Sequence, residues 1–310
     1  MNAPGRYIVL DRRDCPANLR PRLQTSLDGL RSVGWTQRLE LDGLEVWTPA
    51  GSALPVVQVH RRHLLIGDYH GTTTLSALCG LARDAGQLAR SVVGSGWGRY
   101  ILIFRDADDV LRLLRDPTGA LDAVHWVRDG LTVVTDATVG PLDRLLPLEV
   151  EIDWDGLARI ASDVAWLAFS VPLTGLSTAI QGALTTPGTG DALTVWTPGT
   201  AARRPNDDPS AEALAAVVDG TVATLLQSRP RILAELSGGL DSAIVAAAVR
   251  RAGATPSTTF LNYHPAQAEG DERGHARAVA AWLDLPLTEI AKPPARLDLD
   301  TLALLGLGFR

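Results

Sequence analysis

Short apolar runs with period-two alternation dominate the first 145 or so residues, and this pattern is typical of strands. Between the later runs, Asp, Gly and Pro cluster at 105–109, 116–119 and 128–130, where they indicate hairpin turns. One stretch, 73–91, instead spaces its apolar residues for a helix. The predicted strands are 7–10, 44–47, 54–59, 63–69, 99–104, 110–115, 124–127 and 131–135. Together these elements predict a mainly antiparallel sheet packed on helices.

The next sixty or so residues read as a bridge between two domains. A helix is predicted to begin near 151–155, with Asp153 or Asp155 as its N-cap. Its apolar face would comprise Leu157, Ile160, Ala161 and Val164. Residues 201–209 are polar and Pro-rich, which places the domain boundary there. The predicted domains are therefore 1–205 and 206–310.

The pattern changes again after an amphipathic helix predicted at 210–226. Strands are predicted at 231–236, 257–261 and 287–290, with helices at 241–253 and 271–284 between them. The second of these helices would bury Ala276, Val279, Ala280 and Leu283. Alternating strands and helices predict a parallel, doubly wound sheet, which binds ligands at the carboxyl ends of its strands.

Composition narrows the class of protein. The chain has 310 residues, 46% of them hydrophobic and 21% charged, with a net charge of −6. It has no large basic block, so we expect no nucleic-acid partner. The start of the chain lacks the apolar core of a signal peptide, and no apolar stretch is long enough to span a bilayer. Cys15 and Cys79 lie far apart without metal-ligand spacing. A cytoplasmic protein without a membrane partner is predicted.

The stretch from Leu236 to Ser242 carries the clearest chemistry. Two glycines follow a predicted strand, so the backbone can turn sharply and approach a ligand closely. The N–H groups at the start of the following helix favour phosphate. The stretch has neither the lysine of a Walker A loop nor the glycine spacing of a Rossmann fingerprint. Asp241 would repel a bare phosphate, but it fits one that carries Mg²⁺.

The motif S-G-G-L-D-S at 237–242 resembles the pyrophosphate-binding loop (PP-loop) of N-type ATP pyrophosphatases, and in particular the synthetase domain of the asparagine synthetase superfamily. The resemblance implies ATP and Mg²⁺ as cofactors, with Asp241 as the metal ligand. The residues that it assigns to the nucleotide are Leu236, Ser237, Gly238, Gly239, Leu240, Asp241, Ser242, Leu261 and Asn262, with Phe260 beside them. Glu272 and Arg273 either reach the substrate or cap a helix, while His264 and His275 are interpreted as surface residues.

The first half resembles the family's amino-terminal glutaminase domain, through the segments GWGRYILIF and LRDPTGALDAVHW. In glutamine-dependent members the nucleophile is a cysteine directly after the initiator methionine. Here position 2 is Asn2, and both cysteines are internal. Glutamine hydrolysis is therefore not predicted. Arg115, Asp116 and Gly119 are expected to shape a turn rather than to bind substrate.

The implied fold class is an α+β glutaminase-like (Ntn-type) sandwich followed by an α/β doubly wound ATP pyrophosphatase domain, truncated at its C-terminus. The resemblance is strongest to lasso peptide cyclases, then to β-lactam synthetases, with an asparagine synthase-like protein as the alternative. It implies a peptide or amino-acid-derived carboxylate as substrate, which is adenylated and then closed into an intramolecular amide. A leader-binding protein and a protease are the implied partners.

The family's second acidic motif and its late lysine are not found in the chain, so the catalytic residues stay unassigned. Lys292, the one lysine, follows the third predicted strand and does not match the family's position. Three interpretations remain open: part of an ATP-dependent cyclase that needs residues beyond 310, a non-catalytic protein that binds ATP or peptide, or the product of a decayed gene.

Overall fold

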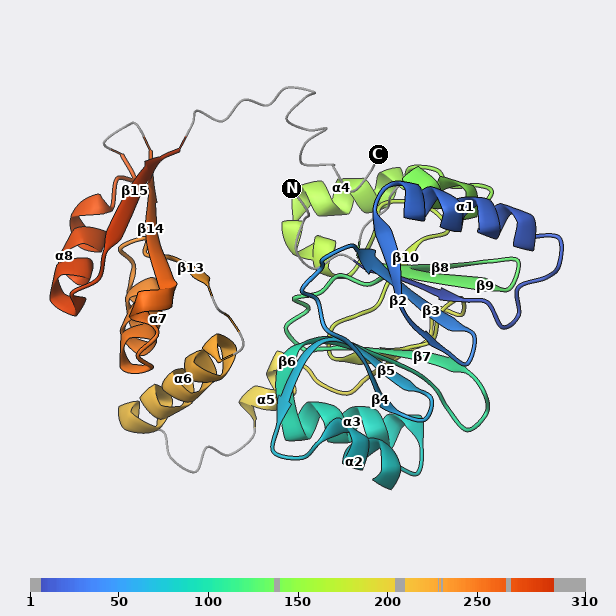
Figure 1. Cartoon of the computed structure of the whole chain (residues 1–310), viewed down its shortest axis with the longest axis horizontal. Coiled ribbons are helices and arrows are strands. Elements are labelled where there is room, and N and C mark those ends of the chain that lie inside the picture. The colour runs from blue at the N-terminus through green and yellow to red at the C-terminus, as the bar shows by residue number, and fades with distance from the viewer. Residues whose placement is uncertain are drawn as a thin grey trace. The chain divides into compact units, whose positions relative to one another are not determined.

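The computed structural model describes residues 7–136, 140–203, 210–227, 229, 231–265 and 269–292. These residues form two compact units, the first over 7–203 and the second over 210–292 (Figure 1). Asn2, residues 206–209 and the residues after Lys292 lie outside the described residues.

The first unit contains two six-stranded sheets, and every strand pair in them is antiparallel. One sheet has the order β10-β8-β9-β1-β3-β2, and the other has the order β12-β11-β7-β6-β5-β4. The strands are β1 (Ile8–Asp11), β2 (Trp35–Leu41), β3 (Leu44–Pro49), β4 (Val56–His60), β5 (His63–Gly71), β6 (Gly96–Arg105), β7 (Leu111–Arg115), β8 (Val124–Arg128), β9 (Leu131–Thr135), β10 (Ser177–Thr178), β11 (Ala183–Thr185) and β12 (Ala192–Thr194).

Each sheet packs against the other sheet on one face and against helices on its other face, because buried side chains alternate along the strands. In β1, Val9 faces the second sheet, in a core that includes Val46 of β3 and Ile101 of β6. Its neighbours Ile8 and Leu10 point the other way and pack against helix α1 (Arg20–Ser32). Because side chains alternate between the faces of a strand, one run of buried residues serves two cores. The unit is therefore a four-layer helix–sheet–sheet–helix sandwich, not a single sheet on helices.

Two features of this unit depart from the sequence prediction of one helix over 73–91. Helix α1 was not predicted, although Pro21 at its first turn and the spacing of Leu23, Leu27 and Leu30 are helix signals. The predicted helix is two helices, α2 (Leu75–Leu81) and α3 (Ala85–Ser95). Thr74 and Asp84 each accept a hydrogen bond from a backbone N–H three residues on, so each begins a new helix.

The bridge contains the 3₁₀ segments η1 (Gly140–Leu145) and η2 (Val164–Ala168) and the helices α4 (Trp154–Ser162) and α5 (Pro198–Ala202). Asp153 is the N-cap of α4, which is one of the two predicted caps. The predicted apolar face of this helix is wrong: Leu157 is 38% exposed, and Val164 lies beyond the helix and is 71% exposed.

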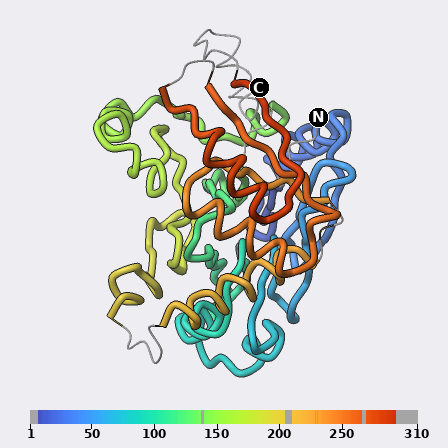
Figure 2. The backbone as a smooth tube through the Cα atoms, turned by 90° about the vertical axis from the view of Figure 1, so that its left-hand side faces the viewer, coloured from blue at the N-terminus to red at the C-terminus, as the bar shows by residue number. Residues whose placement is uncertain are grey.

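The second unit is a three-stranded parallel sheet with the order β13-β14-β15, formed by β13 (Ile232–Glu235), β14 (Thr258–His264) and β15 (Leu287–Ala291). Helix α7 (Leu240–Arg251) and the 3₁₀ turn η3 (Thr255–Ser257) join β13 to β14, and α8 (Arg273–Leu283) joins β14 to β15. Figure 2 traces this alternation in orange to red. Helix α6 (Ala211–Leu226) precedes β13, with Ser210 as its N-cap.

The sheet buries one face under α7 and α8. Phe260 of β14 packs in one cluster with Ala246 and Val249 of α7 and with Ala276 and Ala280 of α8. Two crossovers in the same direction put both helices on the same side, because such crossovers are right-handed. On the opposite face, Leu233 is 68% exposed and Tyr263 is 37% exposed. The doubly wound form, which needs helices on both faces, stays a prediction.

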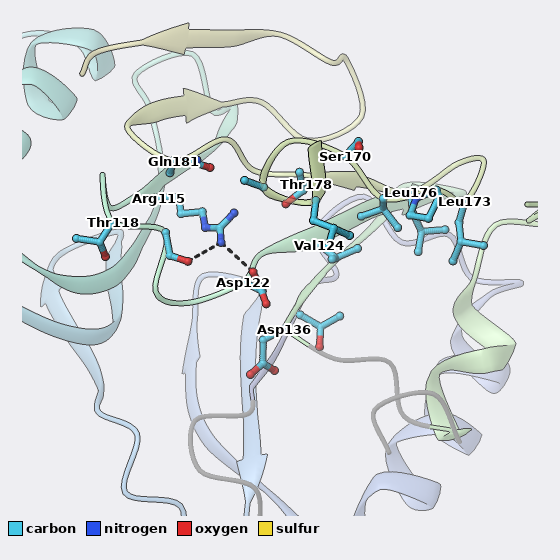
Figure 3. A pocket seen from close by; sticks show the side chains of 16 residues that line it. Arg115, Thr118, Asp122, Val124, Asp136, Ser170, Leu173, Leu176, Thr178 and Gln181 are labelled. Carbon is cyan, nitrogen blue, oxygen red and sulfur yellow. Dashed lines mark hydrogen bonds and ion pairs between the residues drawn. The ribbon is translucent and has the colours of Figure 1, made fainter. Parts of the chain in front are cut away.

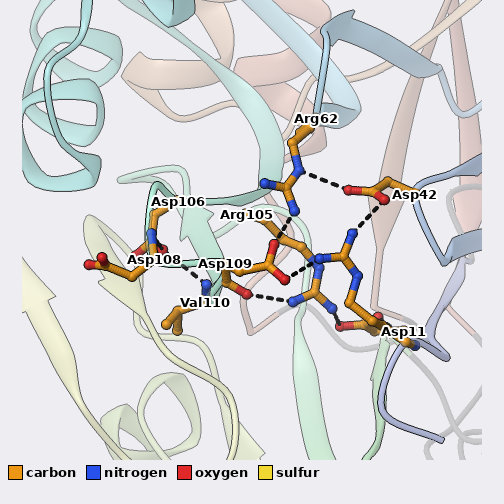
Figure 4. Close-up of polar contacts among 9 residues, drawn as sticks. Asp11, Asp42, Arg62, Arg105, Asp106, Asp108, Asp109 and Val110 are labelled. Atoms are coloured by element: carbon orange, nitrogen blue, oxygen red, sulfur yellow. Dashed lines mark hydrogen bonds and ion pairs between the residues drawn. The ribbon is translucent and has the colours of Figure 1, made fainter.

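A cluster of charged side chains joins the turns of the first unit (Figure 4). Asp109 in the β6–β7 turn pairs with Arg13 and with Arg62 of the β4–β5 turn. Asp42 in the β2–β3 turn pairs with the same two arginines, at 2.5 and 2.8 Å. Beneath them the buried Arg105 pairs with the buried Asp11. The cluster thus connects turns of both sheets.

Candidate functional site

The loop between β13 and α7 is fixed at its start by the neighbouring strand. Leu236 is fully buried, and its N–H donates to the carbonyl of Leu261 at 2.7 Å. This bond continues the ladder between β13 and β14 by one residue. The loop therefore begins at the carboxyl ends of the parallel strands, which is where such sheets bind ligands.

Gly238 sets the path of the loop. Its φ is +104°, a conformation that L side chains rarely adopt. A Cβ placed there would lie 2.8 Å from the carbonyl oxygen of Glu272 and 3.1 Å from the Cβ of His275. The glycine therefore lets the loop backbone pass directly over the start of α8. Gly239 differs, since its φ is −77° and its nearest neighbour would be the Ser237 hydroxyl at 3.6 Å.

The two serines of the motif bond to each other across the loop. Their hydroxyl oxygens lie 3.0 Å apart, and the Ser242 hydroxyl accepts a hydrogen bond from the Ser237 N–H at 3.2 Å. The Ser242 hydroxyl also lies 3.1 Å from the carbonyl oxygen of Gly239, to which it can donate. The serines thus hold the closed shape of the loop before any ligand binds.

The start of α7 is open to a ligand. Gly239 is the N-cap residue and has no side chain, so it caps none of the first N–H groups of the helix. Asp241 and Leu240 lie in the first turn and are exposed. Within the described residues, the Asp241 carboxylate makes no hydrogen bond or ion pair. Uncapped N–H groups beside an unpaired carboxylate form a site with both anion- and cation-binding groups.

Asn262 is placed differently from a surface ligand-binding residue. It is 1% exposed, and its Nδ2 donates to the carbonyl of Leu236 at 2.8 Å. Its Oδ1 is buried and accepts no hydrogen bond from any described residue. The side chains of Leu261 and Phe260 are also buried. Asn262 therefore ties the end of β14 to the loop, and the assignment of Leu261 and Asn262 to a nucleotide stays a prediction.

The start of α8 borders the same loop. Glu272 is its N-cap residue, and its side chain caps no N–H group. Arg273 makes a double ion pair with Asp271 at 2.6–3.0 Å, and this guanidinium lowers the Asp271 pKa to about 2. His275 is exposed, as expected of a surface residue, and His264 is half-buried. The predicted capping role of the Glu272 side chain is therefore wrong, and its predicted role toward a substrate stays a prediction.

The first unit bears out the structural reading of the R-D-x-x-G segment. The Arg115 guanidinium donates to the carbonyls of Leu121, Ala179 and Gly119 at 2.7–3.0 Å. Asp116 accepts from the N–H groups of Thr118, Gly119 and Tyr100 at 2.8–3.1 Å. Both side chains are therefore used in holding the turn.

Neither cysteine lies in a site that favours a thiolate. Both are buried and unpaired, and burial raises the pKa of Cys15 and raises that of Cys79 to about 11. In the described part of the chain, no group of three or more His, Cys, Asp or Glu residues is placed to hold a metal ion. Nor does any described helix combine the length and the apolar character needed to cross a membrane.

Comparison with known proteins gives one family match. The asparagine synthase family model matches residues 213–298, which include the loop and the alternating strands and helices of the second unit. No curated protein matches the chain. A solved structure named as the allosteric regulatory enzyme of purine biosynthesis is 9% identical and covers 93% of this chain and 81% of its own, with a TM-score of 0.34. That score supports no argument about this protein. The family match covers less than a third of the chain, and it shows that the second unit is similar to the asparagine synthase family.

Proposed function

We propose that the second unit binds Mg²⁺-ATP at Ser237–Ser242. We further propose that the chain acts in an ATP-dependent, amide-forming ligase reaction of the asparagine synthetase superfamily. The observation that carries the proposal is the geometry of this loop, in a segment that matches the asparagine synthase family. An uncapped helix start at the carboxyl ends of parallel strands is a ready-made phosphate site.

The described residues fit a magnesium ion at Asp241. Magnesium is held by carboxylates together with substrate phosphates, and the Asp241 carboxylate is exposed and unpaired within the part of the chain that the structure describes. When bound, the metal supplies positive charge that offsets the polyphosphate. The N–H groups of the α7 start would bind phosphate oxygens, and the Ser237–Ser242 pair would keep them oriented.

The reaction follows from the family. A substrate carboxylate oxygen attacks the α-phosphorus of ATP, and pyrophosphate leaves. An amine then attacks the acyl carbon of the resulting acyl-adenylate and loses a proton, and AMP leaves. The products are an amide, AMP and pyrophosphate. Within this scheme the loop has one task, to bind and orient the phosphates that become pyrophosphate.

The finer part of the proposal is that the amide is intramolecular and that the substrate is a peptide, as in lasso peptide cyclases. Its support is chemical. Cys15 and Cys79 are buried, and burial raises the pKa of both thiols, so neither is suited to attack glutamine and release ammonia. An amine already carried by the substrate is then the simplest nucleophile.

Equilibrium binding of ATP, with and without Mg²⁺, tests the site on the whole chain by calorimetry. Asp241→Asn is expected to remove the gain in affinity that Mg²⁺ gives, because the metal loses its protein ligand. Asp284→Asn is the matched control, since Asp284 lies in the same unit and its side chain is 92% exposed. Its backbone has φ +54°, which asparagine also tolerates.

The outcomes separate clearly. A magnesium-dependent affinity lost only in Asp241→Asn supports the site, whereas equal binding by both variants and the parent refutes it. The finer part is tested by pyrophosphate release from ATP in the presence of peptides with an Asp or Glu side chain and a free N-terminus. Ring closure in the peptide product, seen as loss of one water by mass, supports it. Release that depends on free ammonia instead would identify an asparagine synthase-like reaction.

A further inference from the structure

The first unit contains a cavity of about 580 Å³ whose lining residues all belong to that unit (Figure 3). None of these residues belongs to the loop at Ser237–Ser242 that the proposed function uses. One side is polar and comprises the turn after β7 and the end of β9. The other side is apolar and comprises the segment from Leu167 to Leu176 together with Val124 of β8. This volume is within the range of sites for small organic ligands.

Hydrogen bonds from the buried Arg115 and Tyr7 fix the polar side of the cavity. Arg115 has only 4% of its side chain exposed, and its donors are used by three carbonyls and by Oδ1 of Asp122 at 2.9 Å. The Tyr7 hydroxyl donates to the Asp122 carbonyl at 2.7 Å, and the Tyr7 N–H donates to Asp136 at 2.9 Å. Both aspartates of the cavity are therefore held in place by buried groups.

The cavity is acidic and rich in acceptors. Its lining has one guanidinium, that of Arg115, against the two carboxylates of Asp122 and Asp136. The Asp122 side chain is 73% exposed, and no hydrogen bond between described residues uses its Oδ2. Gln181 also lines the cavity, and its buried Oε1 accepts no hydrogen bond from the described residues. A ligand that donates hydrogen bonds and carries positive charge complements these groups.

The opposite wall favours an apolar group beside that charge. Val171, Pro172 and Leu173 line it, together with the buried Leu176. Figure 3 shows Val124, Leu173 and Leu176 on one side and Asp122 with Asp136 on the other. We propose that this cavity binds a peptide amino terminus, with the α-ammonium at Asp122 and Gln181 and the first apolar side chain against Leu173 and Leu176.

The proposal concerns binding alone and does not depend on ATP. Calorimetry on the whole chain would compare Leu-Leu-amide, which carries the ammonium, with N-acetyl-Leu-Leu-amide, which is neutral and keeps both side chains. Gly-Gly-amide keeps the ammonium and lacks the side chains. Leu-Leu-amide is expected to bind at least about tenfold more tightly than either, since a charge-assisted hydrogen bond and a buried leucine each contribute that much.

Two variants locate the site. Asp122→Asn keeps the acceptor for Arg115 and removes the charge, and it should weaken Leu-Leu-amide about tenfold while leaving the acetylated peptide unchanged. Asp143→Asn, in η1 and outside the cavity lining, is the control and should change neither. Far-UV circular dichroism checks that both variants fold. Equal binding of the two leucine peptides, equal loss in both variants, or no binding of Leu-Leu-amide would overturn the proposal.

Discussion

Gly238→Ala is the substitution whose cost can be worked out most directly from the structure. The positive φ of +104° costs an alanine about 1–2 kcal/mol. The added Cβ would lie 2.8 Å from the carbonyl oxygen of Glu272, which belongs to backbone and cannot swing aside. Such overpacking costs about 1–3 kcal/mol. Alanine also restricts the unfolded chain more than glycine does, and this offsets about 0.4–1 kcal/mol of the destabilisation. The second unit should lose roughly 1–5 kcal/mol.

Alanine substitutions at two other glycines distinguish the cost of the positive φ from the cost of the close Cβ contact. Gly253 also has a positive φ, of +70°, but its Cβ would meet no atom within 4 Å, so Gly253→Ala carries the backbone cost alone, about 1 kcal/mol. Gly239 has an ordinary φ, and its Cβ would make only a normal contact, 3.6 Å from the Ser237 hydroxyl, so Gly239→Ala should cost under about 1 kcal/mol as a poorer N-cap. The expected order of destabilisation is Gly238, then Gly253 and Gly239.

Hydrogen exchange followed by mass spectrometry measures this order in the intact chain. Protection of β14 reports the opening free energy of the second unit, whatever the first unit does. Parent and variants would be compared at one pH and temperature. If Gly238→Ala exchanged no faster than Gly239→Ala, the close contact between the loop and the start of α8 would be refuted.

Three further predictions concern the first unit. Asp11→Ala leaves the buried Arg105 charge without its carboxylate and should cost about 3–5 kcal/mol in urea unfolding, against under about 1 kcal/mol for Asp28→Ala in an exposed pair. Burial lowers the His125 pKa to about 4 in the folded state, so between pH 6.5 and 4 the unfolded state binds a proton that the folded state does not. The free energy of unfolding should therefore fall by about 3 kcal/mol as pH drops from 6.5 to 4. His125→Phe should flatten that slope, and an unchanged slope would contradict the assignment. With a pKa of about 11, Cys79 should resist iodoacetamide at pH 8 until the chain is unfolded, as counted by mass spectrometry.

The second unit was the more predictable from sequence, because its signals are local. The strand, glycine turn and helix around Ser237–Ser242 follow one another directly, and each lies within one or two residues of its predicted position. Three of the four residues predicted to be buried in α8 are buried, and Val279 is half-buried. The role of Asn262 could not be foreseen, because its bond partner, Leu236, is 26 residues away.

The first unit was less predictable, because its order depends on distant pairings. Most of its strands were predicted, yet the pairing of β1 with both β3 and β9 joins residues far apart in sequence. Nothing local distinguishes the two sheets, so the sequence indicated only one. The cavity was missed for the same reason: Asp122, Asp136 and Gln181 lie in separate turns and carry no shared motif.

The charged cluster on the turns also bears on how long the native state lasts. Arg13 and Asp109 are 96 residues apart, and Arg105 and Asp11 are 94 apart. Contacts of such long sequence separation close large loops, so we expect them to form late in folding. Interactions absent from the transition state govern the rate of unfolding and leave the folding rate nearly unchanged. We therefore expect the cluster to lengthen the lifetime of the folded first unit more than it changes how fast that unit forms.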